Sequence, residues 1–375
     1  MKFSVDRDVL ADAVAWTSRA VPARPPVPVL AGVRIDATAE GSVVLSSFDY
    51  EVSARGEFPA QVDQEGSVLV SGRLLREIAN ALPHKPVTFV LDGTKVSVTC
   101  GASRFTLATM PVDQYPALPV MPEQSGTVDG ATLQAAVAQV TSAASRDETL
   151  PILTGIRMEI EGSTISLLAT DRYRLALREL SWKPSTSDLS AVALVRARTL
   201  ADTTKALGAG EVSLALSSGA GVDLLGLEAG GLVTTSLLMD GDYPPVRRLF
   251  PDETPITAVV KTSELIEATR RVSLVAERNS SVRLAFADGE VVLDAGQTDD
   301  AQASEALEAI VEGGEITVAF NPSYLLDGLN ALGSEYVRFG FTQETKPVDF
   351  VGMDKPDGTV ASEFRYLLVP IRIAS

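Results

Sequence analysis

Apolar residues recur three or four positions apart in six stretches of this chain, a spacing that places side chains on one face of an α-helix. One such series is Leu75, Ile78 and Leu82, and another begins with Leu133 and Val137. These series predict helices over approximately residues 7–20, 72–82, 131–145, 197–208, 262–277 and 322–333.

Three of these helices have residues that favour a helix start. Asp129 and Ser263 stand at the beginning of two apolar series, where a short polar side chain can accept a hydrogen bond from a free backbone N–H. Asn321-Pro322 joins a capping residue to a proline at the first helical position. We therefore expect helices to begin at these three points.

Shorter runs between the helices alternate apolar and polar residues or are rich in β-branched residues, which is typical of strands. Examples are residues 43–46, 87–91, 212–216 and 315–320. Turn sequences separate them, among them Asp92-Gly93, Glu161-Gly162 and Asp288-Gly289. Each helix is thus followed by about four strands, which predicts an α+β fold of mostly antiparallel sheets with helices on one side.

The chain also nearly repeats itself at intervals of roughly 120–130 residues. The clearest echoes pair residues 29–33 with 152–156, 47–50 with 169–172, and 113–116 with 241–244. A third, weaker copy begins near Leu265. Solenoid and propeller repeats are only about 20–50 residues long, so this period indicates three similar domains and a ring, an arc or another pseudo-symmetric assembly.

The domain boundaries follow from the repeat and from two proline-rich segments. The segments at residues 117–126 and 249–256 have the composition of linkers. We expect the three domains to cover residues 1–120, 127–250 and 255–375.

Composition narrows the class of protein. The chain has 375 residues, enough for three cores, and lacks an apolar run of about 18 residues that would suggest a membrane span. Asp6, Asp8 and Asp12 interrupt the N-terminal region where a signal peptide would be apolar, so we expect a cytoplasmic protein. The single cysteine, Cys100, lies in a strand-like alternation and is expected to be a small buried side chain.

The net charge of −17 is unevenly distributed. The predicted helices and their flanks form six windows, at residues 7–24, 71–82, 130–146, 196–208, 261–278 and 321–333. These windows hold thirteen cations and eight anions, which leaves a net charge of −22 on the rest of the chain. Relatively basic helices on an acidic body suit a surface that faces a polyanion, although solvated helices of mixed charge are the alternative.

Candidate catalytic residues are few. His84, the only histidine, lies in a proline-bounded loop and is expected to be solvated. The numbers of His and Cys exclude a zinc site built from them, and no phosphate-binding loop occurs. The pair Asp299-Asp300 leaves a two-carboxylate hydrolase as the rival hypothesis, with weak support.

Three stretches of the chain resemble the bacterial sliding clamp family, the β subunit of the DNA polymerase III holoenzyme. They are residues 1–5 with 24–30, residues 169–176, and residues 366–373. The resemblance covers the whole chain in matching order. It implies three tandem clamp domains, a head-to-tail homodimer closed into a ring, and helices that face encircled duplex DNA. It also implies a non-enzymatic processivity factor without a cofactor, whose partners are the replicative polymerase, the clamp loader ATPase and other proteins with a clamp-binding motif.

The resemblance further implies a pocket for a partner peptide that carries a glutamine and apolar anchors. Its residues would be Leu153, Thr170, Arg172, Tyr173, Arg174, Leu175, Pro244, Arg248, Leu249, Asn321, Tyr324, Leu367, Val369, Pro370, Ile371 and Arg372. Arg172-Tyr173 replaces a smaller pair that is common in the family, and Ala374-Ser375 extends past the usual end. We expect a bulkier, more cationic pocket mouth as a result.

Two further sets of residues are expected by the same comparison. The cations expected to face DNA are Arg24, Arg73, Arg146, Arg196, Arg198, Lys205 and Arg278. The apolar residues expected at the dimer interface are Phe105 and Leu107 on an edge strand, and Leu274 at the end of the fifth helix.

Overall fold

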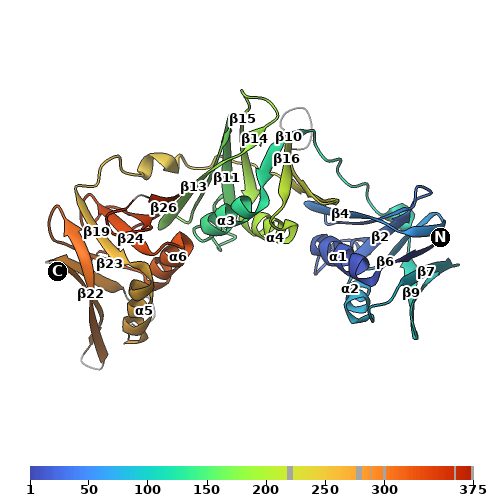
Figure 1. Cartoon of the computed structure of the whole chain (residues 1–375), viewed down its shortest axis with the longest axis horizontal. Helices are drawn as coiled ribbons and strands as arrows, with labels where there is room; N and C mark the ends of the chain where they lie inside the picture. Colours follow the sequence, from blue (N-terminus) through green and yellow to red (C-terminus); the bar gives the residue numbers. More distant parts are fainter. Residues whose placement is uncertain (218–222, 276–280, 288, 299–300, 359, 373–375) are drawn as a thin grey trace. The chain divides into compact units, whose positions relative to one another are not determined.

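The structure is a computed structural model that describes residues 1–217, 223–275, 281–287, 289–298, 301–358 and 360–372. The chain divides into two compact bodies, and Figure 1 labels their helices and most of their strands. The first comprises Met1–Ala131, Lys183–Thr186 and Asp202–Leu238. The second comprises Thr132–Trp182, Ser187–Ala201 and Met239–Ser375.

The first repeat begins with a strand and a helix and has a second helix two-thirds of the way along. Its elements are β1 (Lys2–Val5), α1 (Arg7–Thr17), β2 (Gly32–Ala37), β3 (Ser42–Phe48), β4 (Val52–Pro59), β5 (Gln61–Gln64), β6 (Gly66–Ser71), α2 (Gly72–Ala81), β7 (Val87–Asp92), β8 (Lys95–Cys100) and β9 (Ser103–Met110). The two helices pack against each other, and α1 also packs on β3 and β4.

The second repeat has the same order of elements. They are β10 (Gln124–Asp129), α3 (Gly130–Thr141), β11 (Gly155–Glu161), β12 (Thr164–Thr170), β13 (Arg174–Ser181), β14 (Lys183–Pro184), β15 (Ser190–Arg196), α4 (Ala197–Leu207), β16 (Glu211–Ser217), β17 (Leu224–Ala229) and β18 (Leu232–Leu237).

The third repeat, weak in sequence, keeps this order as well. Its elements are β19 (Ile256–Lys261), α5 (Thr262–Val272), β20 (Val282–Ala287), β21 (Glu290–Thr298), β22 (Ala301–Glu312), β23 (Ile316–Phe320), α6 (Pro322–Leu332), β24 (Tyr336–Phe341), β25 (Val348–Met353) and β26 (Val360–Leu368). The long β22 pairs with both β21 and β19, so it combines the pairings that β4 and β5 make separately in the first repeat.

Strands of successive repeats join into continuous antiparallel sheets. The first body holds a sheet in the order β14-β10-β16-β17-β18-β4-β3-β2-β6-β9-β8-β7-β1-β5, and the second holds β15-β11-β12-β13-β26-β25-β24-β19-β22-β21-β20-β23. Two pairs make the joins, β18 with β4 and β26 with β13. The last strand of one repeat therefore extends the sheet of the repeat before it.

The six predicted helices are confirmed, and so are the strands that were given as examples, but the helices end earlier than predicted. The apolar spacing continues into turns whose hydrogen bonds span three residues instead of four. Examples are Ala143 N–H to Val140 O at 3.0 Å and Ala144 N–H to Thr141 O at 3.2 Å. The 3₁₀ segments Ser18–Ala20 and Ser273–Val275 extend α1 and α5 in the same way. Such turns keep residues near the core without the α-helical bond pattern, so periodicity alone overestimates helix length. Three strands, rather than about four, follow the second helix of each repeat.

The predicted helix starts have mixed outcomes. Asn321 caps α6, because its Oδ1 accepts from Ser323 N–H at 2.9 Å and Tyr324 N–H at 3.3 Å, and Pro322 follows it as predicted. Asp129 directly precedes α3. The prediction for Ser263 is wrong, since α5 begins one residue earlier and Thr262 N–H donates to Glu335 O at 2.9 Å. A distant carbonyl therefore serves one end of this helix in place of a local cap.

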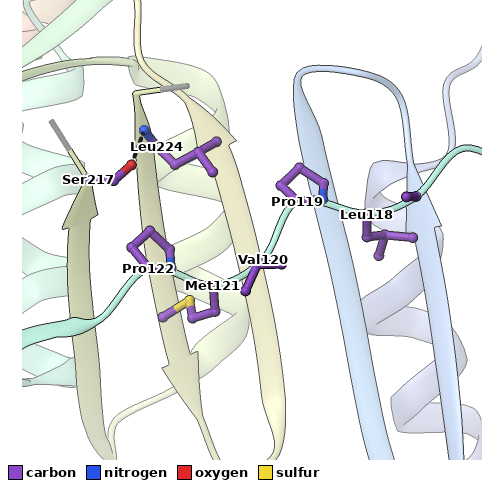
Figure 2. A pocket seen from close by; sticks show the side chains of 8 residues that line it. Leu118, Pro119, Val120, Met121, Pro122, Ser217 and Leu224 are labelled. Atoms are coloured by element: carbon purple, nitrogen blue, oxygen red, sulfur yellow. Dashed lines mark hydrogen bonds between the residues drawn. The ribbon is translucent and has the colours of Figure 1, made fainter. Parts of the chain in front are cut away.

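The linker after the first repeat packs directly on β17. Figure 2 shows Met121 and Pro122 beside Leu224, at a cavity of about 480 Å³. A Cβ added to Gly226 would lie 2.3 Å from the Met121 sulfur, so glycine is what permits this approach. The cavity is lined by Ala117, Leu118, Pro119, Val120, Met121, Pro122, Ser217 and Leu224, none of which was predicted as a site residue.

Candidate functional site

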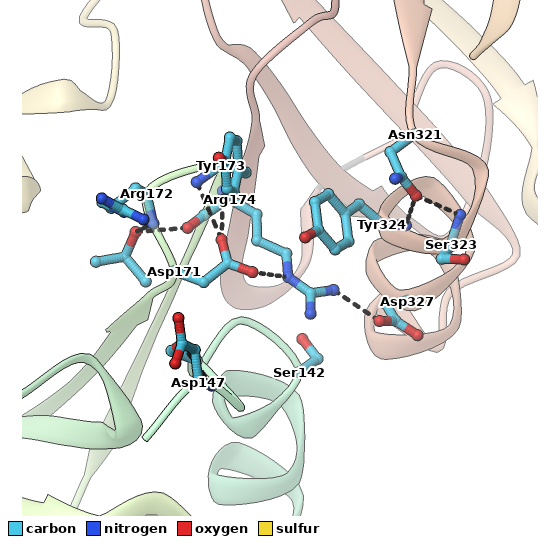
Figure 3. A network of polar contacts seen from close by, with 12 residues as sticks. Ser142, Asp147, Asp171, Arg172, Tyr173, Arg174, Asn321, Ser323, Tyr324 and Asp327 are labelled. Atoms are coloured by element: carbon cyan, nitrogen blue, oxygen red, sulfur yellow. Dashed lines mark hydrogen bonds and ion pairs between the residues drawn. The ribbon is translucent and has the colours of Figure 1, made fainter. Parts of the chain in front are cut away.

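The turn between β12 and β13 is held by its own side chains (Figure 3). The Asp171 carboxylate accepts from Tyr173 N–H at 3.0 Å and Arg174 N–H at 3.1 Å. The Thr170 hydroxyl donates to Arg174 O at 2.6 Å and accepts from Arg172 N–H at 3.1 Å. These bonds hold Arg172 in a left-handed conformation, φ 80°, that few residues other than glycine adopt.

The first repeat contains the same turn between β3 and β4. The Asp49 carboxylate accepts from Glu51 N–H at 2.9 Å and Val52 N–H at 2.6 Å, and Tyr50 has a φ of 76°. The sequence echo between residues 47–50 and 169–172 thus corresponds to a shared backbone geometry set by one aspartate.

Arg174 links this turn to helix α6. Its side chain is 5% exposed, and Nε donates to Asp171 Oδ2 at 2.9 Å while Nη1 donates to Asp327 Oδ2 at 2.6 Å. Burial alone would lower the pKa of Arg174, but Tyr366, Asp327 and Asp171 together raise the pKa above its usual value. The guanidinium therefore stays charged between two carboxylates, one from the second repeat and one from the third.

Three tyrosines surround this arginine. Its guanidinium carbon lies 4.3 Å from the centre of the Tyr324 ring, and the Tyr173 ring stacks on Tyr324 with centroids 6.2 Å apart. The Tyr366 hydroxyl donates to Tyr324 O at 2.9 Å. Burial raises the pKa of both Tyr324 and Tyr366, so both rings are neutral at physiological pH.

An apolar cluster lies behind the turn. Predicted residues Leu153, Leu175 and Leu367 are buried in it. Its other buried members are Leu168, Leu177, Leu194, Tyr243, Val246 and Phe250. The Tyr243 hydroxyl accepts from Thr170 N–H at 3.0 Å, and burial raises the pKa of Tyr243 to about 12. The cluster therefore packs against the turn and supplies a hydrogen-bond acceptor for its backbone.

The C-terminal segment runs alongside the turn. Val369 N–H donates to Tyr173 O at 2.9 Å, and Ile371 N–H donates to Ala319 O at 2.7 Å. Pro370 is buried between them, whereas the side chains of Val369 and Ile371 are about 40% exposed. The segment thus holds an apolar surface open to solvent beside Tyr173.

Most of the other predicted pocket residues are exposed, and one already has hydrogen-bond partners within the protein. Pro244, Arg248, Leu249, Arg172 and Arg372 are exposed. Asn321 is committed to the helix cap, so its carbonyl oxygen already has two donors. Arg247 was not predicted as a site residue. Its guanidinium joins the Val246–Leu249 turn to Glu179, to Ser166 at 3.1 Å and to Glu159 at 3.5 Å.

Most of the cations expected to face DNA lie on the surface. Arg24, Arg73, Arg146, Arg198 and Lys205 are exposed, and Arg196 is partly buried. Arg73 makes only a loose pair with Glu77, at 3.8 Å on the same helix face. Arg278 lies outside the described residues.

The residues expected at the dimer interface differ in burial within the single chain. Leu107 is 5% exposed within the core of the first repeat, and Phe105, on the same face of β9, packs against that core. Their place at a dimer interface stays a prediction. Leu274 is 84% exposed, and Ser103–Ala108 of β9 pair with β8, while β6 reaches only Thr109 and Met110. In the described part of the chain, the β9 edge at Ser103–Ala108 and the Leu274 side chain are both open to a second chain.

His84 and Cys100, the residues considered for chemistry, both lie in the described part of the chain. His84 is 76% exposed beside Asp8, 3.1 Å away, and Cys100 is buried as expected. Asp299 and Asp300 lie outside the described residues. Within the ranges that the structure describes, no group of three potential metal ligands occurs, and no helix is long and apolar enough to cross a membrane.

Comparison with known proteins agrees with this architecture. Three models of the DNA polymerase III beta subunit match in succession: the N-terminal domain at residues 1–119, the central domain at 127–245 and the C-terminal domain at 247–366. The chain is 54% identical to the beta sliding clamp of Streptomyces coelicolor over 100% of both chains. It is 56% identical to the beta sliding clamp of Micrococcus luteus, over 83% of this chain and 100% of that one.

Solved structures give the same result. The DNA polymerase sliding clamp of Bacillus subtilis superposes with a TM-score of 0.91 at 27% identity, over 100% of both chains. The sliding clamp of Pseudomonas aeruginosa bound to griselimycin gives a TM-score of 0.91 at 25% identity, also over 100% of both chains.

Three clamp domains in tandem, each with two helices on antiparallel sheets, define a DNA sliding clamp. The chain belongs to the family of bacterial DNA polymerase III beta subunits. It is a processivity factor of replication and not an enzyme, and the hydrolase hypothesis has no support among its relatives.

Proposed function

We propose that two copies of this chain close head to tail into a ring that encircles duplex DNA without reading its sequence. The match of three consecutive domain models to one chain is the observation that carries this proposal. Exposed cations near the helices, including Arg24, Arg73 and Arg198, would contact phosphates weakly on a body of net charge −17. The ring would act in the cytoplasm, where the chromosome lies.

Topology predicts how this DNA complex responds to salt. Clamps loaded by a clamp loader ATPase onto circular DNA should persist when salt is raised, because linkage does not depend on ion pairs. Binding of free clamps to linear DNA should be weak and lost at the same salt concentration. Gel filtration of loaded complexes before and after linearising the DNA measures both, and equal salt sensitivity would contradict the ring.

We further propose that the C-terminal segment, the 170–174 turn and the exposed Leu249 form the attachment site for the replicative polymerase, the clamp loader and other clamp-binding proteins. The occupant would be an extended peptide with a glutamine and apolar anchors. Exposed Val369 and Ile371 beside Tyr173 support this assignment, since their apolar surface lacks cover in the described chain.

Truncation tests this attachment site. Deleting residues 369–375 should abolish binding of a fluorescent peptide containing glutamine and leucine, while sedimentation still shows a dimer. A Leu249→Ala variant should weaken the same peptide by about 1–3 kcal/mol through lost apolar contact. Val192→Ala is the control, because Val192 is also exposed but lies on the edge strand β15. Unchanged peptide affinity in the folded, truncated dimer would refute the assignment.

A further inference from the structure

Arg174 belongs to the set of residues expected to contact the partner peptide, but two of its side-chain nitrogens already donate to carboxylates of the protein. Nε and Nη1 donate to Asp171 and Asp327, and the Tyr366 hydroxyl lies beside the guanidinium. The side chain is 5% exposed. A buried guanidinium between two carboxylates holds structure in place and leaves little for a ligand to bind.

The second carboxylate comes from a distant part of the chain. Asp327 lies on α6, 153 residues after Arg174, and its side chain is 40% exposed. Figure 3 shows the bond from Arg174 reaching across from the turn to Asp327 on the helix. Asp171 fixes the turn through two backbone N–H groups, so one ionic chain runs from the turn through Arg174 to α6.

The Tyr324 ring is placed by this chain of contacts. Tyr324 stands one turn before Asp327 on α6, and its ring lies against both the Arg174 guanidinium and the Tyr173 ring. Tyr173 is 54% exposed, and its carbonyl holds the C-terminal segment. A shift of Arg174 would therefore move an aromatic pair at the surface that a partner would approach.

We propose that Asp327, acting through Arg174, is a positioning residue that sets the Tyr324–Tyr173 pair and thereby the affinity for a partner peptide. This proposal rests on the peptide site proposed above. Asp327 would act on the peptide through Tyr324. Arg174 would hold the turn and α6 together and would not itself contact the peptide.

A double-mutant cycle tests this coupling. Asp327→Ala keeps a good helix former on α6 and removes one acceptor of Arg174. We expect it to weaken peptide binding about tenfold to a hundredfold, which corresponds to the loss of one hydrogen bond to a charged group. In a Tyr324→Ala background the same change should alter affinity by less than about twofold, because residues that act through each other are not additive. Additive losses would overturn the proposal.

A matched control removes a carboxylate elsewhere. Glu264 lies in α5 and pairs with Lys261 at 3.0 Å in an exposed ion pair, so Glu264→Ala changes net charge and helix chemistry in the same way. Peptide affinity should not change in Glu264→Ala. An equal loss in this variant would show a general charge effect and would also overturn the proposal.

A direct probe of Tyr324 separates this proposal from the peptide site. The chain has seven tyrosines, so labelling with 3-fluorotyrosine allows the Tyr324 fluorine signal to be assigned with Tyr324→Phe. Asp327→Ala should move that signal and Glu264→Ala should not. If the wild-type dimer binds no peptide, the peptide site is refuted while the fluorine shift still tests the positioning role. An unmoved signal would refute positioning alone.

Discussion

Single aspartates and tyrosines decide local geometry at the proposed peptide site. Asp171 and Asp49 each collect two backbone N–H groups and so fix a left-handed residue after them. Tyr243 supports one of these turns from the apolar cluster, since its hydroxyl accepts from Thr170 N–H. A single polar atom in a buried cluster therefore helps to hold the turn that carries Arg172 and Tyr173.

Replacing Tyr243 by phenylalanine should reveal this support. The change leaves a buried N–H without its acceptor and should lower the free energy of unfolding by about 1–3 kcal/mol at neutral pH. Urea denaturation followed by circular dichroism measures the loss. Tyr50→Phe, at a ring about half exposed, should change stability little and is the control.

The same pair of variants should differ in alkaline solution. Burial raises the pKa of Tyr243 to about 12, whereas an unfolded tyrosine ionises near about 10. Between these values the unfolded state has lost the proton and the folded state keeps it, so stability falls as pH rises. Tyr243→Phe should flatten this fall, and an unchanged pH slope would contradict it.

At the scale of elements, α6 carries much of the site. It begins at the Asn321 cap, presents Tyr324 and Asp327 to the turn, and packs Gly328 on Tyr366. A Cβ at Gly328 would lie 2.4 Å from the Tyr366 ring, which is fully buried and held in a group of phenylalanines. The helix and β26 can approach this closely only because the residue is glycine.

Gly328→Ala should therefore destabilise the protein, although alanine is favoured over glycine by about 1 kcal/mol in an exposed helix. Thermal unfolding should show a lower midpoint, and peptide binding should weaken because Tyr366 bonds to Tyr324 O. Ser323→Ala on the exposed side of the same helix should leave both unchanged. A raised midpoint in Gly328→Ala would show that helix propensity outweighs the contact.

At the scale of the whole molecule, strand pairing joins the three repeats within each chain. The pairs β18–β4 and β26–β13 extend a sheet from one repeat into the next. The first repeat has no preceding repeat to extend, and part of β9 has an unpaired edge in the described chain. An edge of this kind favours pairing with another chain, which agrees with a head-to-tail dimer.

Leu274→Asp should test this dimer. Leu274 is almost fully exposed in the single chain, so aspartate there should not unfold the protein but should disrupt an apolar contact between chains. Sedimentation velocity at low micromolar concentration should then show folded monomers. Val120→Asp is the control, because Val120 is an exposed apolar residue on the first linker. A persistent Leu274→Asp dimer would mean that the interface lies elsewhere.

The three repeats, the six helices, the buried cysteine and the resemblance to sliding clamps could all be predicted from the amino-acid sequence. These depend on the spacing of apolar residues and on short motifs, and such patterns are set by neighbours a few positions apart. The same local logic explains why Asn321 could be identified as a cap. It also explains why helix ends were overestimated, because apolar spacing does not distinguish an α-helix from a following 3₁₀ turn.

Contacts between residues far apart in the sequence could not be predicted and are seen first in the folded chain. Ser263 was a reasonable cap by sequence, but Glu335 O satisfies the helix start from 73 positions away. Leu107, which the family resemblance places at the dimer interface, is buried against the core of its own repeat in the single chain. Arg174 meets Asp327 across 153 residues. Folding brings residues that are distant in the sequence into contact, within one repeat or between two, and no local pattern records such contacts. The energy of a buried ion pair in particular depends on packing and burial.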